Sequence, residues 1–117
     1  MLRFLLKFRY SWNGLLAAAR SELAFRLELM ILVVAVPLAF FVATDIWRWV
    51  ALIGVVLMVL VVELLNTAVE KLADHVTPDQ HVAIGRIKDM GSAAVLISLL
   101  LAGLVWLAAL GERLGMI

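Results

Sequence analysis

The chain has 117 residues, enough for one domain, and 66% of them are hydrophobic whereas only 16% are charged. A soluble domain of this size would need more polar surface, and a disordered chain would have far fewer apolar residues. The net charge of +1 gives no electrostatic reason to expect nucleic-acid binding, and the lack of cysteine excludes disulfides and thiol chemistry. The composition predicts a small all-α integral membrane protein with one domain over residues 1–117, in which each charged side chain is informative.

Residues 1–27 predict an amphipathic helix with a basic face that lies at the membrane surface. Apolar residues recur at spacings of three and four between Leu5 and Leu23, and five Lys and Arg residues are interspersed along the segment. A signal peptide would place its apolar run sooner after the basic start, whereas the long apolar run here begins only after residue 28. We therefore expect a surface helix and no cleaved leader.

Three apolar runs predict transmembrane helices over about 28–44, 47–70 and 90–110. The third run has 21 residues, about 31 Å of helix, which matches a hydrocarbon core of about 30 Å. A short polar break at Thr44–Asp45 separates the first two helices, so we expect them to be antiparallel neighbours. A polar connector over 75–89 precedes the third helix.

The basic residues predict the orientation of the chain in the membrane. Five Lys and Arg residues precede the first expected span and three lie within residues 71–89, whereas only Arg48 and Arg113 lie on the other side. Lys and Arg are enriched in cytoplasmic loops. We therefore expect the N-terminus and the 71–89 connector in the cytoplasm, and the C-terminus on the opposite side of the membrane.

Glu63 is the most informative residue, because it follows four consecutive apolar residues of the second span. At 100° per residue, Asn66 lies about 60° from Glu63, and Glu70 and Asp74 each lie about 20° from it. These four residues form one polar stripe on an otherwise apolar helix. The stripe could fix the helix register through buried hydrogen bonds, or it could be a carboxylate site at the cytoplasmic boundary. A partly desolvated carboxylate suits a general base, and several carboxylates suit Mg²⁺.

Four charged residues outside the stripe are further candidates. Glu22 and Glu28 could supply more oxygen ligands, although either alone is more often a surface charge. Lys88 and Asp89 stand just before the third span, where Asp89 could cap a helix or the pair could contact phosphate groups, and the sequence leaves both interpretations open. No P-loop, dinucleotide-binding fingerprint or zinc-site spacing is present in the chain.

Four motifs follow one another along the chain. They are Tyr10-Ser-Trp-Asn-Gly-Leu15, Glu22-Leu-Ala-Phe-Arg-Leu-Glu28, Glu63-Leu-Leu-Asn-Thr-Ala-Val-Glu70 followed by Asp74, and Arg86-Ile-Lys-Asp-Met-Gly-Ser-Ala-Ala-Val95. Together they resemble the prokaryotic diacylglycerol kinases. The resemblance covers nearly the whole chain and extends to its length, its three spans and its surface helix.

The resemblance implies a homotrimer in the bacterial inner membrane, with the C-terminus in the periplasm. It implies a lipid kinase that transfers the γ-phosphoryl group of Mg-ATP to the hydroxyl of diacylglycerol, giving phosphatidic acid and ADP. Glu63 would be the general base, and Glu22 and Glu70 would hold the divalent Mg²⁺. The implied ATP contacts are Arg3, Tyr10, Glu22, Glu70, His81, Lys88 and Asp89. The implied contacts to the lipid substrate are Ala24, Phe25, Arg26, Glu28, Glu63, Asn66 and Ser92.

One subunit has too few helices to enclose an active site, so we expect shared sites in the homotrimer. Each site would combine Glu63 and Glu70 of one chain with at least one of Lys88, Asp89 and Glu22 from another chain. Two alternatives remain open. An undecaprenol kinase of the same fold shares the Glu-Asn-Glu core, and a non-enzymatic ion-coupled membrane subunit would use Glu63 as its coupling carboxylate. The second alternative needs a polar path across both halves of the membrane, which the apolar spans scarcely offer.

Overall fold

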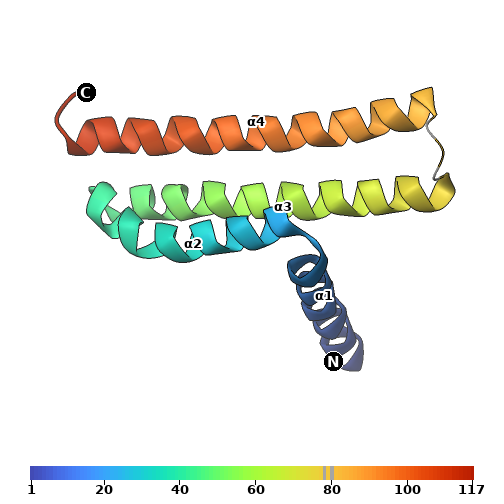
Figure 1. Ribbon diagram of the computed structural model, residues 1–117. Helices are drawn as coiled ribbons and strands as arrows, with labels where there is room; N and C mark the ends of the chain where they lie inside the picture. Colours follow the sequence, from blue (N-terminus) through green and yellow to red (C-terminus); the bar gives the residue numbers. More distant parts are fainter. Residues whose placement is uncertain (78, 80) are drawn as a thin grey trace.

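Three long helices packed side by side and one shorter helix that leaves the bundle make up the chain (Figure 1). The computed structural model describes residues 1–77, 79 and 81–117. Its four helices among these residues are α1 (Leu2–Ser21), α2 (Leu23–Val42), α3 (Ile46–Val76) and α4 (Val82–Arg113). The last three are long and apolar enough to cross a membrane. The predicted all-α class is thus confirmed, with three helices that could be the expected spans, and α2 and α3 pack as antiparallel neighbours across the short Thr44–Asp45 break.

The junction between α1 and α2 is a single residue, Glu22, whose extended backbone ends one helix and begins the next. The Arg26 guanidinium donates hydrogen bonds to the carbonyl oxygens of Ala19 at 2.9 Å and Arg20 at 3.0 Å. These carbonyls lie in the last turn of α1, where they lack helical partners. The sequence pattern places the end of the expected surface helix at residue 27, whereas the first helix of the structure ends at Ser21. The side chain of Arg26 therefore stabilises the C-terminal end of α1, although its backbone belongs to the first turn of α2.

The lengths of the helices determine which parts extend beyond a bilayer. The 20 residues of α2 span about 30 Å, which equals the thickness of a hydrocarbon core. The 31 residues of α3 and the 32 residues of α4 span about 46 and 48 Å. Both helices therefore extend past the start of α2 at the end where they are connected, as Figure 1 shows. They are longer than the expected spans over 47–70 and 90–110 because their polar ends pair with each other outside the apolar region.

The start of α4 settles one question that the sequence left open. The helix begins at Val82, and the Nδ1 atom of His81 accepts a hydrogen bond from the Ala83 amide at 3.2 Å. His81 is therefore the N-cap. Asp89 lies two turns inside the helix, so the interpretation of Asp89 as a helix cap is wrong. The 75–89 connector expected from the sequence is correspondingly much shorter, since helix occupies most of it.

Two apolar clusters hold the helices together. The larger one joins α2, α3 and α4 near the Thr44–Asp45 turn, where alanines permit close approach of the helices. It consists of Ala35, Ala39, Val42, Leu52, Ile53, Val56 and Ala109. The smaller one joins Ala18 of α1, Phe25 of α2 and Leu60 of α3. Phe25 is only 1% exposed, so it fixes the first turn of α2 against α3 at the level of Glu63.

A group of polar side chains closes the bundle at the Thr44–Asp45 turn, and we call it the turn-end cluster. The Asp45 carboxylate accepts the Arg48 backbone amide at 2.8 Å and also pairs with the Arg48 guanidinium at 2.8 Å. Arg48 reaches across to Glu112 of α4 through two hydrogen bonds, and Thr44 donates to Glu112 at 3.1 Å. The amide hydrogen bond from Arg48, followed by the attraction of its guanidinium, lowers the pKa of the Asp45 carboxyl. Each member of the cluster is paired with another.

Candidate active site

Glu63 lies at the far end of the membrane-crossing part of α3. It stands 17 residues after Ile46, the start of the helix, which is about 26 Å along the helix axis. If the turn-end cluster lies at one face of the bilayer, Glu63 lies close to the other face. The residue is only 8% exposed. Burial of a carboxylate costs free energy, so the buried position of Glu63 indicates a structural or functional role for its side chain.

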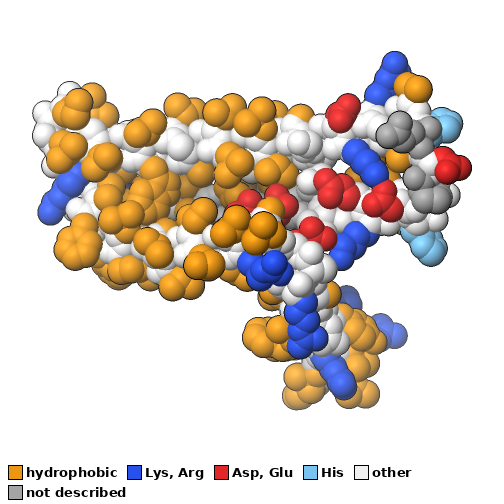
Figure 2. All heavy atoms as spheres, viewed as in Figure 1, with side chains coloured by type: hydrophobic (Ala, Val, Ile, Leu, Met, Phe, Trp, Pro, Cys, Tyr) orange, Lys and Arg blue, Asp and Glu red, His pale blue; other side chains and the backbone are white. Residues whose placement is uncertain are grey.

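Three other glutamates surround Glu63, and we call the group with Asn66 the carboxylate site. Glu22 and Glu70 interact electrostatically with the Glu63 carboxylate, and so does Glu28 of α2. Figure 2 shows acidic side chains gathered where the α1–α2 junction meets α3. Lys71 is the cation that contacts this group, with its Nζ 3.6 Å from the Glu22 carboxylate and 3.0 Å from the Ser21 hydroxyl. The carboxylate site therefore carries a surplus of negative charge.

Asn66 is hydrogen-bonded to another residue of the polar stripe on α3. Its Nδ2 donates a hydrogen bond to Oε1 of Glu70 at 3.2 Å. Its Oδ1 is buried and has no hydrogen-bond partner among the described residues, and the same holds for Oε2 of Glu28. Buried polar atoms in folded proteins are nearly always paired. The two unpaired oxygens, one on α2 and one on α3, indicate a site whose polar groups are completed by a ligand.

The polar stripe continues outward as an ion pair between α3 and α4. Lys88 donates a hydrogen bond to Asp74, and both side chains are partly exposed. The neighbouring Asp89 and Ser92 are exposed on α4. One chain therefore brings Lys88 to the outer end of its own stripe and Glu22 to its inner end. Both residues stand beside α3 of the same chain, whereas the sequence interpretation assigned at least one such residue to another subunit.

The other expected contact residues occupy three kinds of position. Arg3 and Tyr10 are exposed on α1, which points away from the bundle (Figure 1). Phe25 is buried in the smaller apolar cluster, whereas its neighbour Ala24 is exposed on α2. Arg26 binds the end of α1. The structure brings Glu22, Glu28, Glu63, Asn66 and Glu70 together, and it does not bring Arg3 or Tyr10 of the same chain to them.

The sequence interpretation overlooked two polar features. Lys71 counted only as a basic residue for the orientation of the chain, yet it contacts Glu22 and Ser21 at the site. Its position eight residues after Glu63, about 80° around the helix, was the available signal. Arg48 and Glu112 form the ion pair of the turn-end cluster. They are 64 residues apart, and no local pattern in the sequence connects them.

The carboxylate site fits a divalent cation by the chemistry of its donors. Mg²⁺ prefers oxygen ligands and is commonly held by one or two carboxylates together with substrate phosphates. Glu22 and Glu70 can provide such oxygens. In the part of the chain that the structure describes, no group of three or more His, Cys, Asp or Glu side chains is spaced to hold a metal by itself. The arrangement therefore suits a cation that arrives with a phosphate-bearing substrate.

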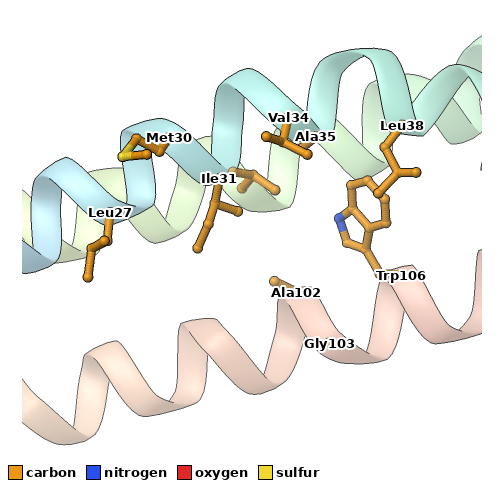
Figure 3. Close-up of a pocket in the computed structure, with 10 residues that line it drawn as sticks. Leu27, Met30, Ile31, Val34, Ala35, Leu38, Ala102, Gly103 and Trp106 are labelled. Carbon is orange, nitrogen blue, oxygen red and sulfur yellow. The ribbon is translucent and has the colours of Figure 1, made fainter.

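An apolar groove of about 650 Å³ runs between α2 and α4. Figure 3 shows apolar side chains from both helices facing this space. The lining residues are Leu27, Met30, Ile31, Val34, Ala35, Leu38, Val56, Ala102, Gly103 and Trp106. The groove begins at Leu27, next to Glu28. The indole Nε1 of Trp106 donates to the Leu52 carbonyl at 3.1 Å, which leaves the wall of the groove without an unpaired donor.

Comparisons with known proteins identify the family of the chain. The family model of the prokaryotic diacylglycerol kinases matches residues 9–110. The diacylglycerol kinase of Escherichia coli K12 is 42% identical over 106 residues, which cover 91% of this chain and 87% of that protein. The diacylglycerol kinase of Haemophilus influenzae is 41% identical and covers 84% of this chain and 83% of its own length. That of Pseudomonas aeruginosa is 40% identical, with 83% and 79% covered.

The resemblance found in the motifs is confirmed over most of the chain. The match includes the α1–α2 junction, the polar stripe of α3 and the first half of α4, which are the parts that build the carboxylate site. It also includes the three helices that are long and apolar enough to span a membrane. The chain belongs to the prokaryotic diacylglycerol kinase family and is a membrane-embedded kinase.

Proposed function

We propose that this protein phosphorylates diacylglycerol, transferring the γ-phosphoryl group of ATP to the free hydroxyl and giving phosphatidic acid and ADP. The observation that carries the proposal is the buried Glu63 among further carboxylates at the membrane boundary, together with the apolar groove between α2 and α4. The relatives from Escherichia coli and Haemophilus influenzae, which are named diacylglycerol kinases, support the same substrate. A lipid alcohol would present its hydroxyl at this depth in the bilayer.

In this proposal Glu63 is the general base. Its carboxylate accepts the hydroxyl proton of the lipid while that oxygen forms a bond to the γ-phosphorus. The bond from the γ-phosphorus to its bridging oxygen breaks, and ADP leaves with the electron pair. Phosphoryl transfer needs mainly positioning and neutralisation of charge. Oxygens of Glu22 and Glu70 would hold Mg²⁺, which would offset the negative charge of the phosphates.

The groove between α2 and α4 supports a lipid as the acceptor. Its lining is apolar and it starts one residue from Glu28, so an acyl chain lying in it would keep the lipid head group near Glu63. Glu28 lies at that level with an oxygen that has no hydrogen-bond partner among the described residues, and this oxygen would pair with a hydroxyl or ester group of the lipid. Ala24, Arg26 and Ser92 complete the proposed lipid side, and the buried Phe25 contributes by packing the first turn of α2.

We further propose a homotrimer in which each active site is shared. Arg3 and Tyr10, which the family resemblance assigns to ATP, lie on a helix that leaves its own bundle. From there they would reach the carboxylate site of a neighbouring subunit, where His81, Lys88 and Asp89 of α4 would also contact the nucleotide. The protein would lie in the bacterial inner membrane with this end in the cytoplasm, where ATP is available. The C-terminus would then be periplasmic.

The experiment that tests the proposed function is a product assay with purified protein in detergent or lipid micelles. The protein is supplied with ATP, Mg²⁺ and, in separate reactions, diacylglycerol, undecaprenol or another lipid alcohol, and the phosphorylated lipids are identified. We expect phosphatidic acid as the main product. If undecaprenol were phosphorylated faster than diacylglycerol, undecaprenol would be the substrate and the proposed substrate would be wrong. If no lipid alcohol were phosphorylated, the proposed function would be wrong.

A further inference from the structure

Gly91 of α4 directly faces Asn66 of α3. A Cβ atom at position 91 would lie 2.2 Å from Oδ1 of Asn66 and 3.3 Å from its Cγ. The first distance is far shorter than any contact between real carbon and oxygen atoms, so the carboxamide of Asn66 occupies the space that a side chain at position 91 would fill. Only glycine permits this arrangement.

The carboxamide that Gly91 accommodates has a defined orientation. Nδ2 of Asn66 donates to Glu70 at 3.2 Å, while Oδ1 is turned toward Gly91, buried and without a hydrogen-bond partner among the described residues. If Oδ1 were pushed away, the whole planar amide would rotate and Nδ2 would leave Glu70. The hydrogen bond from Asn66 to Glu70 is therefore made with Asn66 in a position that requires the space left open by Gly91 on α4.

We infer that Gly91 is a positioning residue of the active site, which holds Asn66 in the orientation that directs the Glu70 carboxylate. The part of this inference that concerns catalysis rests on the proposed function, in which Glu70 binds the metal and ATP. Partners that orient a metal-binding carboxylate affect metal affinity strongly, by about 10- to 100-fold when they are lost. Gly91 would act at one step further removed, through the amide of Asn66.

The other glycines in the three long helices have no such close neighbour at the position of a Cβ atom. A Cβ atom at Gly54, Gly85 or Gly103 would meet no atom within 4 Å, and one at Gly111 would lie in ordinary contact, 3.5 Å from the Ile117 side chain. Alanine at those positions is therefore free of clashes within the chain and should favour the helix, because glycine has the lower helix propensity. The requirement for glycine at position 91 arises from Asn66 alone. Gly85, on the same helix, is a matched control.

A double-mutant cycle on thermal unfolding tests the contact without any enzyme assay. The purified variants Gly91→Ala, Asn66→Ala and the double variant are compared in one detergent, with Gly85→Ala in both backgrounds as control. We expect Gly91→Ala to lower the unfolding temperature when Asn66 is present, and to leave it unchanged or raise it when Asn66 is alanine. If Gly91→Ala yields too little folded protein, recovery of folded protein in the double variant supports the contact, and failure to recover overturns it. Equal effects of Gly91→Ala in both backgrounds would also overturn it.

The Mg²⁺ requirement separates positioning from simple packing. Gly91→Ala should raise the Mg²⁺ concentration for half-maximal activity by about tenfold, whereas Gly85→Ala should leave it unchanged. In the Asn66→Ala background, Gly91→Ala should cause no further increase, because the link to Glu70 is already lost. An unchanged Mg²⁺ requirement in an active Gly91→Ala protein would overturn the positioning role. If the wild-type protein phosphorylated no lipid, the proposed function would fail, and the unfolding cycle would still decide the contact between Gly91 and Asn66.

Discussion

The two ends of the apolar part of α3 carry polar groups of similar kinds, but these groups are paired at one end and left partly unpaired at the other. At the turn end, Asp45 and Glu112 share Arg48 between them. At the other end, Glu63 is buried near Glu22 and Glu70, of which Glu22 pairs with Lys71, and oxygens of Glu28 and Asn66 have no partner among the described residues. A polar cluster whose members all pair with one another stabilises the fold. A cluster left with surplus charge and unpaired atoms indicates that a ligand completes it.

Substitution of one glutamate at each end should have very different effects on turnover. Glu63→Gln keeps the shape of the side chain and removes the proton acceptor, so lipid phosphorylation should fall by about two to four orders of magnitude. Glu112→Gln, the control at the turn end, should keep turnover close to that of the wild type. Turnover is measured on purified protein with equal amounts of folded material. A Glu63→Gln protein that retained more than about a tenth of wild-type turnover would show that Glu63 is structural.

The sharing of sites between subunits can be examined by mixing two inactive proteins. Glu63→Gln and Arg3→Ala are unfolded together and reassembled, and phosphorylation of diacylglycerol is measured. If α1 of one subunit serves the carboxylate site of another, some mixed trimers carry both defects in one site and leave another site intact. Activity should then return in part. A mixture as inactive as its parents, with mixed oligomers shown to be present, would place each site within one chain.

The polar stripe also contains both kinds of carboxylate, those expected to bind the metal and one that is paired with a lysine. Glu22→Ala and Glu70→Ala should each raise the Mg²⁺ concentration needed for half-maximal activity, because each removes an oxygen ligand. Asp74→Ala is the internal control, since Asp74 is paired with Lys88, and its effect should be smaller. The measurement is a Mg²⁺ titration of the initial rate. Unchanged titrations for both glutamate variants would remove these residues from the metal site.

Replacing Asp45 in the turn-end cluster should have a small effect on how the stability of the protein falls with pH. The pKa of Asp45 is lowered in the folded protein, chiefly by the amide of Arg48. The contribution of Asp45 to stability is therefore complete above the unfolded pKa of about 3.9, and it is lost as the pH falls through the lower folded value. Thermal unfolding in detergent between pH 6 and 3 should show a steeper loss of stability for the wild type than for Asp45→Asn. Parallel curves would contradict a role for this carboxylate, whose exposure makes the effect small.

Residues that follow the period of one helix were predictable, and contacts between helices were not. The stripe from Glu63 to Asp74 and the break at Thr44–Asp45 follow from local spacing alone. The start of α4 was misjudged because Arg86, Lys88 and Asp89 interrupt the apolar pattern in the second turn of the helix, so the continuous apolar run begins only at Met90. The contact of Gly91 with Asn66 depends on how α3 and α4 pack, and a glycine in a sequence does not reveal its neighbour.

The length of α2 links the chemistry of this protein to the thickness of its membrane. The helix has 20 residues with Glu22 before it and Asp45 soon after it, so it has no spare apolar turn at either end. In a thicker bilayer, the hydrophobic mismatch would draw the carboxylates toward hydrocarbon or force the lipids around the protein to thin. In a thinner one, tilting of the helix would restore the match. The depth at which the protein meets its lipid is thus set by α2, a helix that supplies few of the reacting groups.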